Sequence, residues 1–181
     1  MSDHNPSLIE ATRETFEREV IERSRDVPVV VEFWASWCQP CRESFPWMAR
    51  MQQKYGPRGL VVVTVDLDED RGAAARFLAD QPGSTSFEQV QDPDGRLAEA
   101  YGLTVMPSSL LFDRQGRPVH RHEGFRAEDA GAYEARIVSL LEGRGPEEAL
   151  PIAPAVPVGL GVQPWERGLL ADPAMQLLAN P

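Results

Sequence analysis

The sequence contains two cysteines, Cys38 and Cys41, separated by Gln39 and Pro40. Two thiols at this spacing can form a disulfide with each other and exchange it with the disulfide of another molecule. Two cysteines are too few for the disulfide framework of a small secreted domain, and with three scattered histidines they do not supply a structural zinc site. Covalent haem attachment requires a histidine directly after the second cysteine, where Arg42 stands. The pattern therefore indicates a redox-active dithiol that needs no cofactor or metal.

The residues around the cysteines predict that a strand and a helix position them. Val29–Trp34 is an almost continuous apolar run rich in β-branched residues, which is typical of a strand covered on both faces. After Cys41, Phe45 and Met48 follow at helical spacing, so we expect Cys38 at the N-terminus of a helix. Free backbone N–H groups and the positive end of the helix dipole favour an anion there. We therefore expect a lowered pKa for the Cys38 thiol.

The rest of the chain up to Leu141 is predicted to alternate strands and helices. Leu60–Val65 is a second β-branched run, and with the first strand and the helix between them it predicts a βαβ unit with parallel strands. Arg117–Glu123 is expected to pair with the preceding strand as a hairpin and to form a sheet edge. The other expected elements are helices over 12–25, 38–55, 71–79, 94–101 (capped by Asp92 or Asp94) and 128–141, and strands over 87–91 and 102–112.

Composition and charge limit the possible partners and compartments. The chain of 181 residues carries a net charge of −10, which disfavours binding to nucleic acid or to an anionic membrane. It has no run of about 18 apolar residues, so we expect no membrane span. Residues 1–6 lack the basic and apolar pattern of a secretory signal, so the chain as it stands is expected in the cytoplasm. The alternative is the periplasm, if a signal peptide has been removed.

Two groups of side chains have the chemistry of metal ligands but are interpreted otherwise. His120 and His122 share one face of a strand, and without a third ligand we expect them as an exposed pair. Asp66, Asp68 and Asp70 alternate like the residues of an ion-binding loop, but the glycine and distal glutamate of an EF-hand are missing. A solvated strand end is the preferred interpretation.

The composition changes after residue 143. Prolines recur every few residues and regular periodicity disappears, so 144–181 is predicted as a Pro-rich tail outside a domain spanning 1–143. Residues 162–175 become amphipathic again, with Trp165 and Leu169 among them. A pure spacer does not need such residues, so we expect a short docking peptide for a dedicated partner.

The motif from Trp37 to Cys41, WCQPC, follows a Phe-Trp-Ala strand and precedes Pro46 and Met106-Pro107. This combination, over residues 16–141, resembles the thioredoxin superfamily. The resemblance implies an α/β fold in which a central mixed β-sheet is flanked by helices on both faces. It also implies a cis peptide bond before Pro107.

Two further segments refine this resemblance. The stretch from 70 to 92 and the strand and turn over 112–116 are similar to the TlpA-like and ResA-like thiol-disulfide oxidoreductases of bacteria. Residues 164–175 resemble a short motif of unknown function found in small bacterial lipoproteins. That second likeness supplies no activity, but it supports the expectation of a dedicated partner for the tail.

One carboxylate follows the pattern of thioredoxin itself. TlpA-like proteins often have a glutamate three residues beyond the second cysteine, where this chain has Ser44. Glu32 instead occupies the position of the buried aspartate of thioredoxin. Glu32 is therefore preferred over Glu43 as the proton-handling group. The alternative for Glu32 is a solvated position at the end of the strand.

The resemblance also implies roles for the remaining site residues. Cys38, exposed at the start of the helix, would attack a client disulfide, and Cys41 would resolve the mixed disulfide. Glu32, if buried beneath the pair, would have a raised pKa and would accept and return the Cys41 proton. Pro107 would face the dithiol. The backbone at Met106 would pair with an extended client segment.

The residues next to the cysteines favour one direction of electron flow. Trp37 is expected in the apolar rim that contacts the client, together with Gln39 and Pro40. Gln39 and Pro40 carry no charge, and no histidine within the loop stabilises the thiolate. The reduced form is then less favoured than in strong oxidants, so we expect a reductase that passes electrons from an upstream reductase to protein disulfides.

Two other functions remain open at this stage. The tail could recruit a partner, with the dithiol as a redox-regulated feature of a binding or assembly module. A thiol peroxidase is the weaker alternative, because the sequence has no Thr-x-x-Cys motif. Turnover of a protein disulfide that disappears in Cys38→Ser would favour the enzyme. Partner capture that survives this change and is lost on deleting the residues after Gly161 would favour the module.

Overall fold

The structure is a computed structural model that describes residues 8–10 and 16–145. A six-stranded mixed sheet in the order β1-β4-β3-β2-β5-β6 forms its centre. The strands β1, β4, β3 and β2 run parallel to one another, whereas β5 is antiparallel to both β2 and β6. The strands are β1 (Leu8–Glu10), β2 (Val29–Trp34), β3 (Val61–Asp66), β4 (Glu88–Gln91), β5 (Ser108–Phe112) and β6 (Pro118–Glu123).

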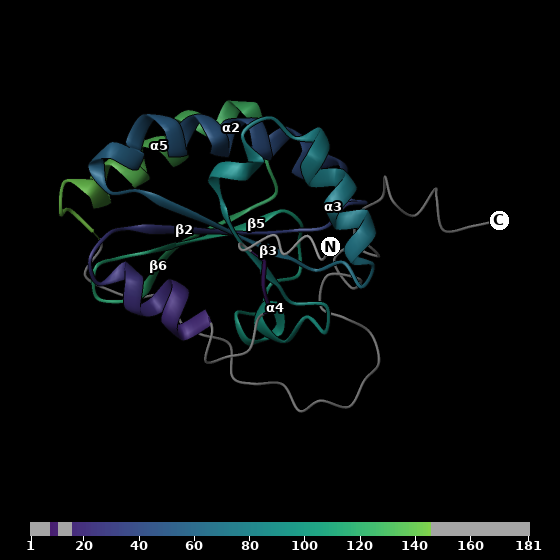
Figure 1. Cartoon of the computed structure of the whole chain (residues 1–181). Coiled ribbons are helices and arrows are strands. Elements are labelled where there is room, and N and C mark those ends of the chain that lie inside the picture. The colour runs from purple at the N-terminus through teal and green to yellow at the C-terminus, as the bar shows by residue number, and fades with distance from the viewer. Residues whose placement is uncertain (1–7, 11–15, 146–181) are drawn as a thin grey trace.

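Helices cover both faces of this sheet (Figure 1). One face carries α2 (Gln39–Tyr55), α3 (Arg71–Asp80) and α5 (Ala130–Leu141), and the other carries η1 (Glu17–Glu22) and α4 (Arg96–Ala100). Short 3₁₀ turns complete the chain at Gly56–Arg58, Ser84–Ser86 and Ala127–Asp129. This is the thioredoxin fold expected from the sequence, with a mixed sheet between two layers of helices.

The side chains of β2 point alternately to the two faces of the sheet, so this one apolar strand contributes to two hydrophobic clusters. Val30 and Trp34 belong to the cluster under α2, α3 and α5, whereas Val31 and Phe33 belong to the cluster under η1 and α4. Neighbouring side chains of a strand point to opposite faces of the sheet. Glu32 is therefore directed to the face of Val30 and Trp34, under α2.

Most predicted elements are confirmed; the differences are the additional strand β1 and the termini of some elements. The hairpin of β5 and β6 and the position of β6 at the sheet edge are as expected. Strand β1 was not predicted, because three residues carry too little periodicity to identify a strand. Helix α4 begins after Gly95, and the carboxylate of Asp92 accepts hydrogen bonds from the backbone of Leu97 and Ala98 rather than capping as an N-cap residue.

Two further observations bear on the tail and on membranes. No helix among residues 8–10 and 16–145 is long and apolar enough to cross a bilayer. The predicted linker and docking peptide, 162–175 included, lie outside the described residues, apart from 144 and 145. The boundary between a domain over 1–143 and a tail over 144–181 therefore stays a prediction.

Candidate active site around the Cys38–Cys41 disulfide

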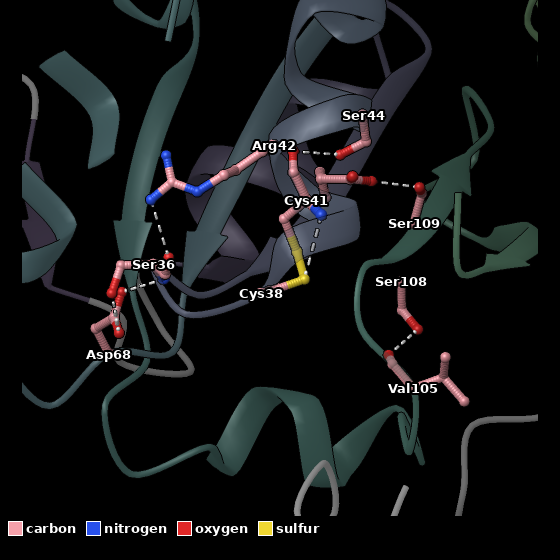
Figure 2. The surroundings of a disulfide bond; sticks show 10 residues. Ser36, Cys38, Cys41, Arg42, Ser44, Asp68, Val105, Ser108 and Ser109 are labelled. Carbon is pink, nitrogen blue, oxygen red and sulfur yellow. Dashed lines mark hydrogen bonds between the residues drawn. A yellow bond between two sulfur atoms is a disulfide. The ribbon is translucent and has the colours of Figure 1, made fainter. Parts of the chain in front are cut away.

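Cys38 and Cys41 form a disulfide at the N-terminus of α2 (Figure 2). Cys38 is the N-cap residue of the helix, and its Sγ accepts a hydrogen bond of 3.3 Å from the backbone N–H of Cys41. The expectation that Cys38 is exposed is wrong for this oxidised state, since only 2% of the residue is accessible. The disulfide holds its sulfur against the first turn of α2. The predicted lowering of the Cys38 pKa concerns the reduced thiol and stays a prediction.

The loop before the disulfide is held by a carboxylate from the neighbouring strand end. Asp68 accepts a 2.7 Å hydrogen bond from the backbone N–H of Ser36 and a 2.9 Å hydrogen bond from the Ser36 hydroxyl (Figure 2). The backbone N–H of Asp68 itself donates to Oδ1 of Asp66 at 2.9 Å. Asp66 and Asp68 are thus buried rather than a solvated strand end, because the loop backbone needs an acceptor there.

Arg42 supports the same loop from the helix side. Its guanidinium lies 4.8 Å from the centre of the Phe77 ring, as in a cation–π contact, and its Nη2 atom is 3.5 Å from the carbonyl oxygen of Ser36. The side chain thus links the first turn of α2 to the loop that carries Ser36 and to α3. Arg42 is exposed, yet its side chain has a structural contact on each side.

Glu32 lies in the interior, with 1% of its surface accessible. Its Oε2 accepts a hydrogen bond from the Ser109 hydroxyl, and burial raises the pKa of Glu32 to about 7 against the opposing effect of the Ser109 and Ser44 hydroxyls. Oε1 has no hydrogen-bond partner among the described residues. The alternative of a solvated Glu32 at a strand end is therefore contradicted.

Ser44 and Ser109 reach this carboxyl group from two elements. Ser44 lies one turn beyond Cys41 on α2, where its hydroxyl donates to the Cys41 carbonyl oxygen at 3.0 Å. Ser109 lies on β5, opposite Glu32 in the antiparallel pairing with β2. Figure 2 shows Ser109 next to the turn of α2 that carries Cys41 and Ser44. Glu32 is thus held in the interior below the helix turn that carries the dithiol.

Pro107 and its neighbours form the segment that enters β5. The Met106–Pro107 peptide bond is cis, as the resemblance implied, and the Pro107 carbonyl oxygen accepts a 2.7 Å hydrogen bond from the backbone of Gly124. Figure 2 places Val105, two positions earlier, in the loop beside the disulfide. Pro107 is buried and Met106 is half-buried.

Two large apolar side chains are exposed near the dithiol. Trp37 and Val105 are large apolar residues with 44% and 38% of their surface accessible. Gln39 and Pro40 are exposed at the start of α2. The predicted rim residues are therefore available to a partner, and Val105 is a further exposed residue that the sequence analysis did not identify.

His120 and His122 are not the exposed pair that the sequence suggested. Both are half-buried, and burial lowers the pKa of His120 to about 4 and also lowers the pKa of His122. The ring of His122 stacks on Tyr133 of α5 at 4.9 Å between centroids. Within residues 8–10 and 16–145, no three His, Cys, Asp or Glu side chains are grouped so that they could hold a metal ion.

Solved structures with similar folds are found among thiol-disulfide exchange proteins. A candidate thiol:disulfide interchange protein DsbE of Chlorobium tepidum is 44% identical, with a TM-score of 0.62 over 66% of this chain and 82% of that chain. A candidate thioredoxin of Neisseria meningitidis, 19% identical, shares the fold with a TM-score of 0.59 over 66% of this chain and 78% of that chain.

Curated relatives agree with the structural neighbours. The DsbE homologue of Paracoccus denitrificans, a thiol:disulfide interchange protein, is 39% identical over 95 residues, or 52% of this chain and 50% of the relative. The thiol-disulfide oxidoreductase ResA of Bacillus subtilis is 30% identical over 91 residues, half of each protein. The chain thus spans about half the length of the curated relatives it matches. A family model described as AhpC/TSA matches residues 7–120, which is more than half of the sequence, and the chain therefore belongs to the AhpC/TSA family.

Proposed function

We propose that the protein is a thiol-disulfide oxidoreductase that reduces disulfides of client proteins through Cys38 and Cys41. The observation that carries the proposal is the disulfide at the N-terminus of α2, next to a buried carboxyl group whose pKa is about 7. The similarity to proteins named DsbE and ResA supports the same chemistry. A dithiol that closes on itself within one helix turn can leave a client with both of its thiols reduced.

The reaction proceeds in two exchange steps. In the first, the Cys38 thiolate attacks one sulfur of the client disulfide, forms a mixed disulfide and releases the first client thiolate. In the second, Glu32 accepts the proton of Cys41, and the Cys41 thiolate attacks the Cys38 sulfur and releases the second client thiolate. The client gains two electrons and the Cys38–Cys41 disulfide forms. An upstream reductase must then return two electrons to the protein.

The client is expected to bind across the exposed residues beside the disulfide. Trp37, Gln39 and Pro40 would contact it from the α2 side. Met106 and Pro107 would contact it from the opposite loop, where an extended client segment can add backbone hydrogen bonds. The exposed apolar area at Trp37 supports this placement, because exposed aromatic side chains are enriched at protein interfaces.

We place this activity in the periplasm, the second of the two compartments that the sequence left open. Disulfide-bonded clients persist in oxidising compartments and are rare in the cytoplasm, so a reductase of structural disulfides meets its substrates there. The reduced Cys41→Ser variant, which cannot resolve a mixed disulfide, would be added separately to periplasmic and cytoplasmic extracts. The proteins that it traps would show in which compartment the clients lie. Trapping confined to cytoplasmic proteins would contradict this placement.

Two measurements test the reductase itself. The reduced protein should cleave the disulfides of insulin, with Cys38→Ser inactive and Cys41→Ser arrested as a stable mixed disulfide. The reduction potential against glutathione should be near that of thioredoxin, about −270 mV. A potential above about −180 mV would instead indicate an oxidant or isomerase. Partner capture unaffected by Cys38→Ser, without any turnover, would favour the binding module.

A further inference from the structure

Tyr133 of α5 is clamped between two rings above the face of the sheet that carries Glu32. Its ring stacks on Trp47 of α2 at 5.1 Å and 23°, and on His122 of β6 at 4.9 Å and 18°. Only 2% of Tyr133 is accessible. Because the interior is close-packed, these two nearly parallel rings, one from α2 and one from β6, leave the phenol ring of Tyr133 little freedom to rotate or shift.

A row of polar side chains crosses three strands below this ring. Glu32 on β2 pairs with Ser109 on β5, and Ser109 pairs in turn with His122 on β6. Directly opposed residues lie on the same face of a sheet, so Glu32, Ser109 and His122 are all directed toward the layer of α2 and α5. Tyr133 covers this row through its stacking on His122.

Two buried atoms in this region lack hydrogen-bond partners among the described residues, Oε1 of Glu32 and the hydroxyl of Tyr133. Ser109 lies next to both groups. It donates a hydrogen bond to Oε2 of Glu32. Burial and the charge of Glu32 raise the pKa of Tyr133, and the Ser109 hydroxyl opposes this effect. One atom is an acceptor and the other a donor. An unpaired polar atom in the interior costs free energy, and a hydrogen bond from the Tyr133 hydroxyl to Oε1 of Glu32 would satisfy both atoms.

We propose that Tyr133 is a positioning residue for Glu32: its hydroxyl donates a hydrogen bond to Oε1 whenever the carboxyl group is ionised. Ser109 and Tyr133 then hold one carboxylate oxygen each. This inference rests on the proposed function, in which Glu32 must be ionised to accept the proton of Cys41. Tyr133 does not touch the reacting sulfurs and transfers no proton in this scheme.

The groups that face Glu32 determine how the hydrogen bond acts. Burial disfavours the ionised carboxylate, and the hydroxyls of Ser109 and Ser44 oppose that effect. A hydrogen bond from Tyr133 to Oε1 would stabilise the ionised form further. The histidines on β6 lie on the outer side of Tyr133, with Asp129 acting on His122 and Arg136 on His120. Burial lowers the pKa of both histidines, which disfavours a positive charge on this cluster.

The test is the ionisation of Glu32 in Tyr133→Phe, which keeps the stacked ring and removes the hydroxyl. The titration midpoint of the Glu32 side-chain carboxyl carbon, followed by ¹³C NMR in the oxidised protein, should move upward by about one pH unit. In single-turnover experiments at pH 7, resolution of the mixed disulfide should slow about five-fold, since that shift reduces the ionised fraction accordingly. Formation of the mixed disulfide should be unchanged.

Matched variants separate this role from a general effect on folding. Tyr55→Phe also removes a hydroxyl from a buried ring, but one that donates to Glu134, and it should leave the Glu32 midpoint in place. Ser109→Ala removes the other donor and should raise the midpoint as well. In a Glu32→Gln background, Tyr133→Phe should have no further effect on resolution.

The possible failures are distinguishable. An unchanged Glu32 midpoint in Tyr133→Phe, or an equal slowing of resolution with and without Glu32, overturns the inference and leaves the reductase intact. A shifted midpoint in a protein that reduces no disulfide supports the contact between Tyr133 and Glu32 and overturns the proposed function. The carboxyl titration does not depend on turnover, so the two results can be obtained separately.

Discussion

Glu32 is the residue whose burial has the largest consequence for the chemistry. Ionising a carboxyl group in the interior costs free energy because the charge loses its hydration. Burial therefore raises the pKa of Glu32 to about 7. Near neutral pH it can therefore both accept and return a proton, which a solvated glutamate with a pKa of 4.5 does poorly. Cys41 lies on the helix turn that Ser44, a partner of Glu32, also occupies.

At the residue scale, Glu32→Gln should slow resolution of the mixed disulfide much more than its formation. Removal of a general base typically costs about 10² to 10⁴ in rate, and in this scheme the base acts only on Cys41. Stopped-flow measurement of both steps with a fluorescent disulfide substrate would give the two rates. Equal effects on both steps, or no effect, would remove Glu32 from the mechanism.

The same substitution makes a prediction about stability. The unfolded chain releases the Glu32 proton near pH 4.5 and the folded protein near pH 7, so the folded state binds more protons between these values. The free energy of unfolding contributed by this group therefore falls as pH rises through that window, and the loss is complete above pH 7. Because glutamine does not ionise, Glu32→Gln should avoid this decrease in the free energy of unfolding, which amounts to up to about 3 kcal/mol.

Urea unfolding of the oxidised proteins at several pH values would measure that difference. The advantage of Glu32→Gln over the wild type should be small at pH 4.5 and should grow toward pH 7. Glu43→Gln on the exposed side of α2 is the matched control and should show no such trend. A pH-independent difference between Glu32→Gln and the wild type would contradict the raised pKa.

At the scale of elements, the connection between β2 and α2 decides where the dithiol lies. Its backbone is held by Asp68, which follows β3 and accepts hydrogen bonds from both the N–H and the hydroxyl of Ser36. Because β2 and β3 are parallel, the loop after β2, with Ser36, and the loop after β3, with Asp68, lie at the same end of the two strands. Trp34 and Asp66, the last residues of the two strands, are paired in that register, so the loops that follow begin side by side.

Asp68→Ala should destabilise the oxidised protein by about 2 kcal/mol, because it leaves the part-buried N–H and hydroxyl of Ser36 without their acceptor. It should also lower the rate of client reduction, since the loop positions Cys38. The control is Asp70→Ala, which removes an exposed N-cap of α3 and should cost about 1 kcal/mol without affecting the rate. Denaturation curves and insulin reduction would check both. Equal effects of the two changes would show that the loop contact has no special role.

At the scale of the whole molecule, the described core is complete without the Pro-rich tail. The two hydrophobic clusters, on either side of the sheet, and the disulfide all lie between Phe16 and Leu140. A chain ending at residue 145 retains both clusters and the disulfide, so it should keep its unfolding free energy and should reduce insulin within about two-fold of the full chain. Loss of turnover on this truncation would show that residues 146–181 take part in catalysis.

The net negative charge of the whole chain bears on which partners it attracts. With a net charge of −10, long-range attraction favours clients and donors with basic surfaces, and salt should weaken their association. Docking of a partner by residues 162–175 stays a prediction. Pull-down with the full chain and with the chain ending at residue 145 would test it.

The sequence by itself determined the dithiol and the order of the elements around it. Spacing identified Cys38 and Cys41 at a helix start, and the β-branched runs predicted β2, β3 and their parallel connection, because these signals are local. Local signals also predicted the hairpin of β5 and β6. They did not reveal β1, which has three residues, or the burial of Asp66 and Asp68, whose acidic pattern is typical of a solvated loop.

Only the tertiary structure decided the surroundings of Glu32. Ser109 lies 77 positions away in the sequence and becomes its partner because β5 joins β2 in antiparallel register. Tyr133 reaches the same place from α5, held by rings from α2 and β6. No spacing in the chain encodes these contacts. They follow from closing the sheet and packing two helices over it, and that packing also removes water from Glu32 and raises its pKa.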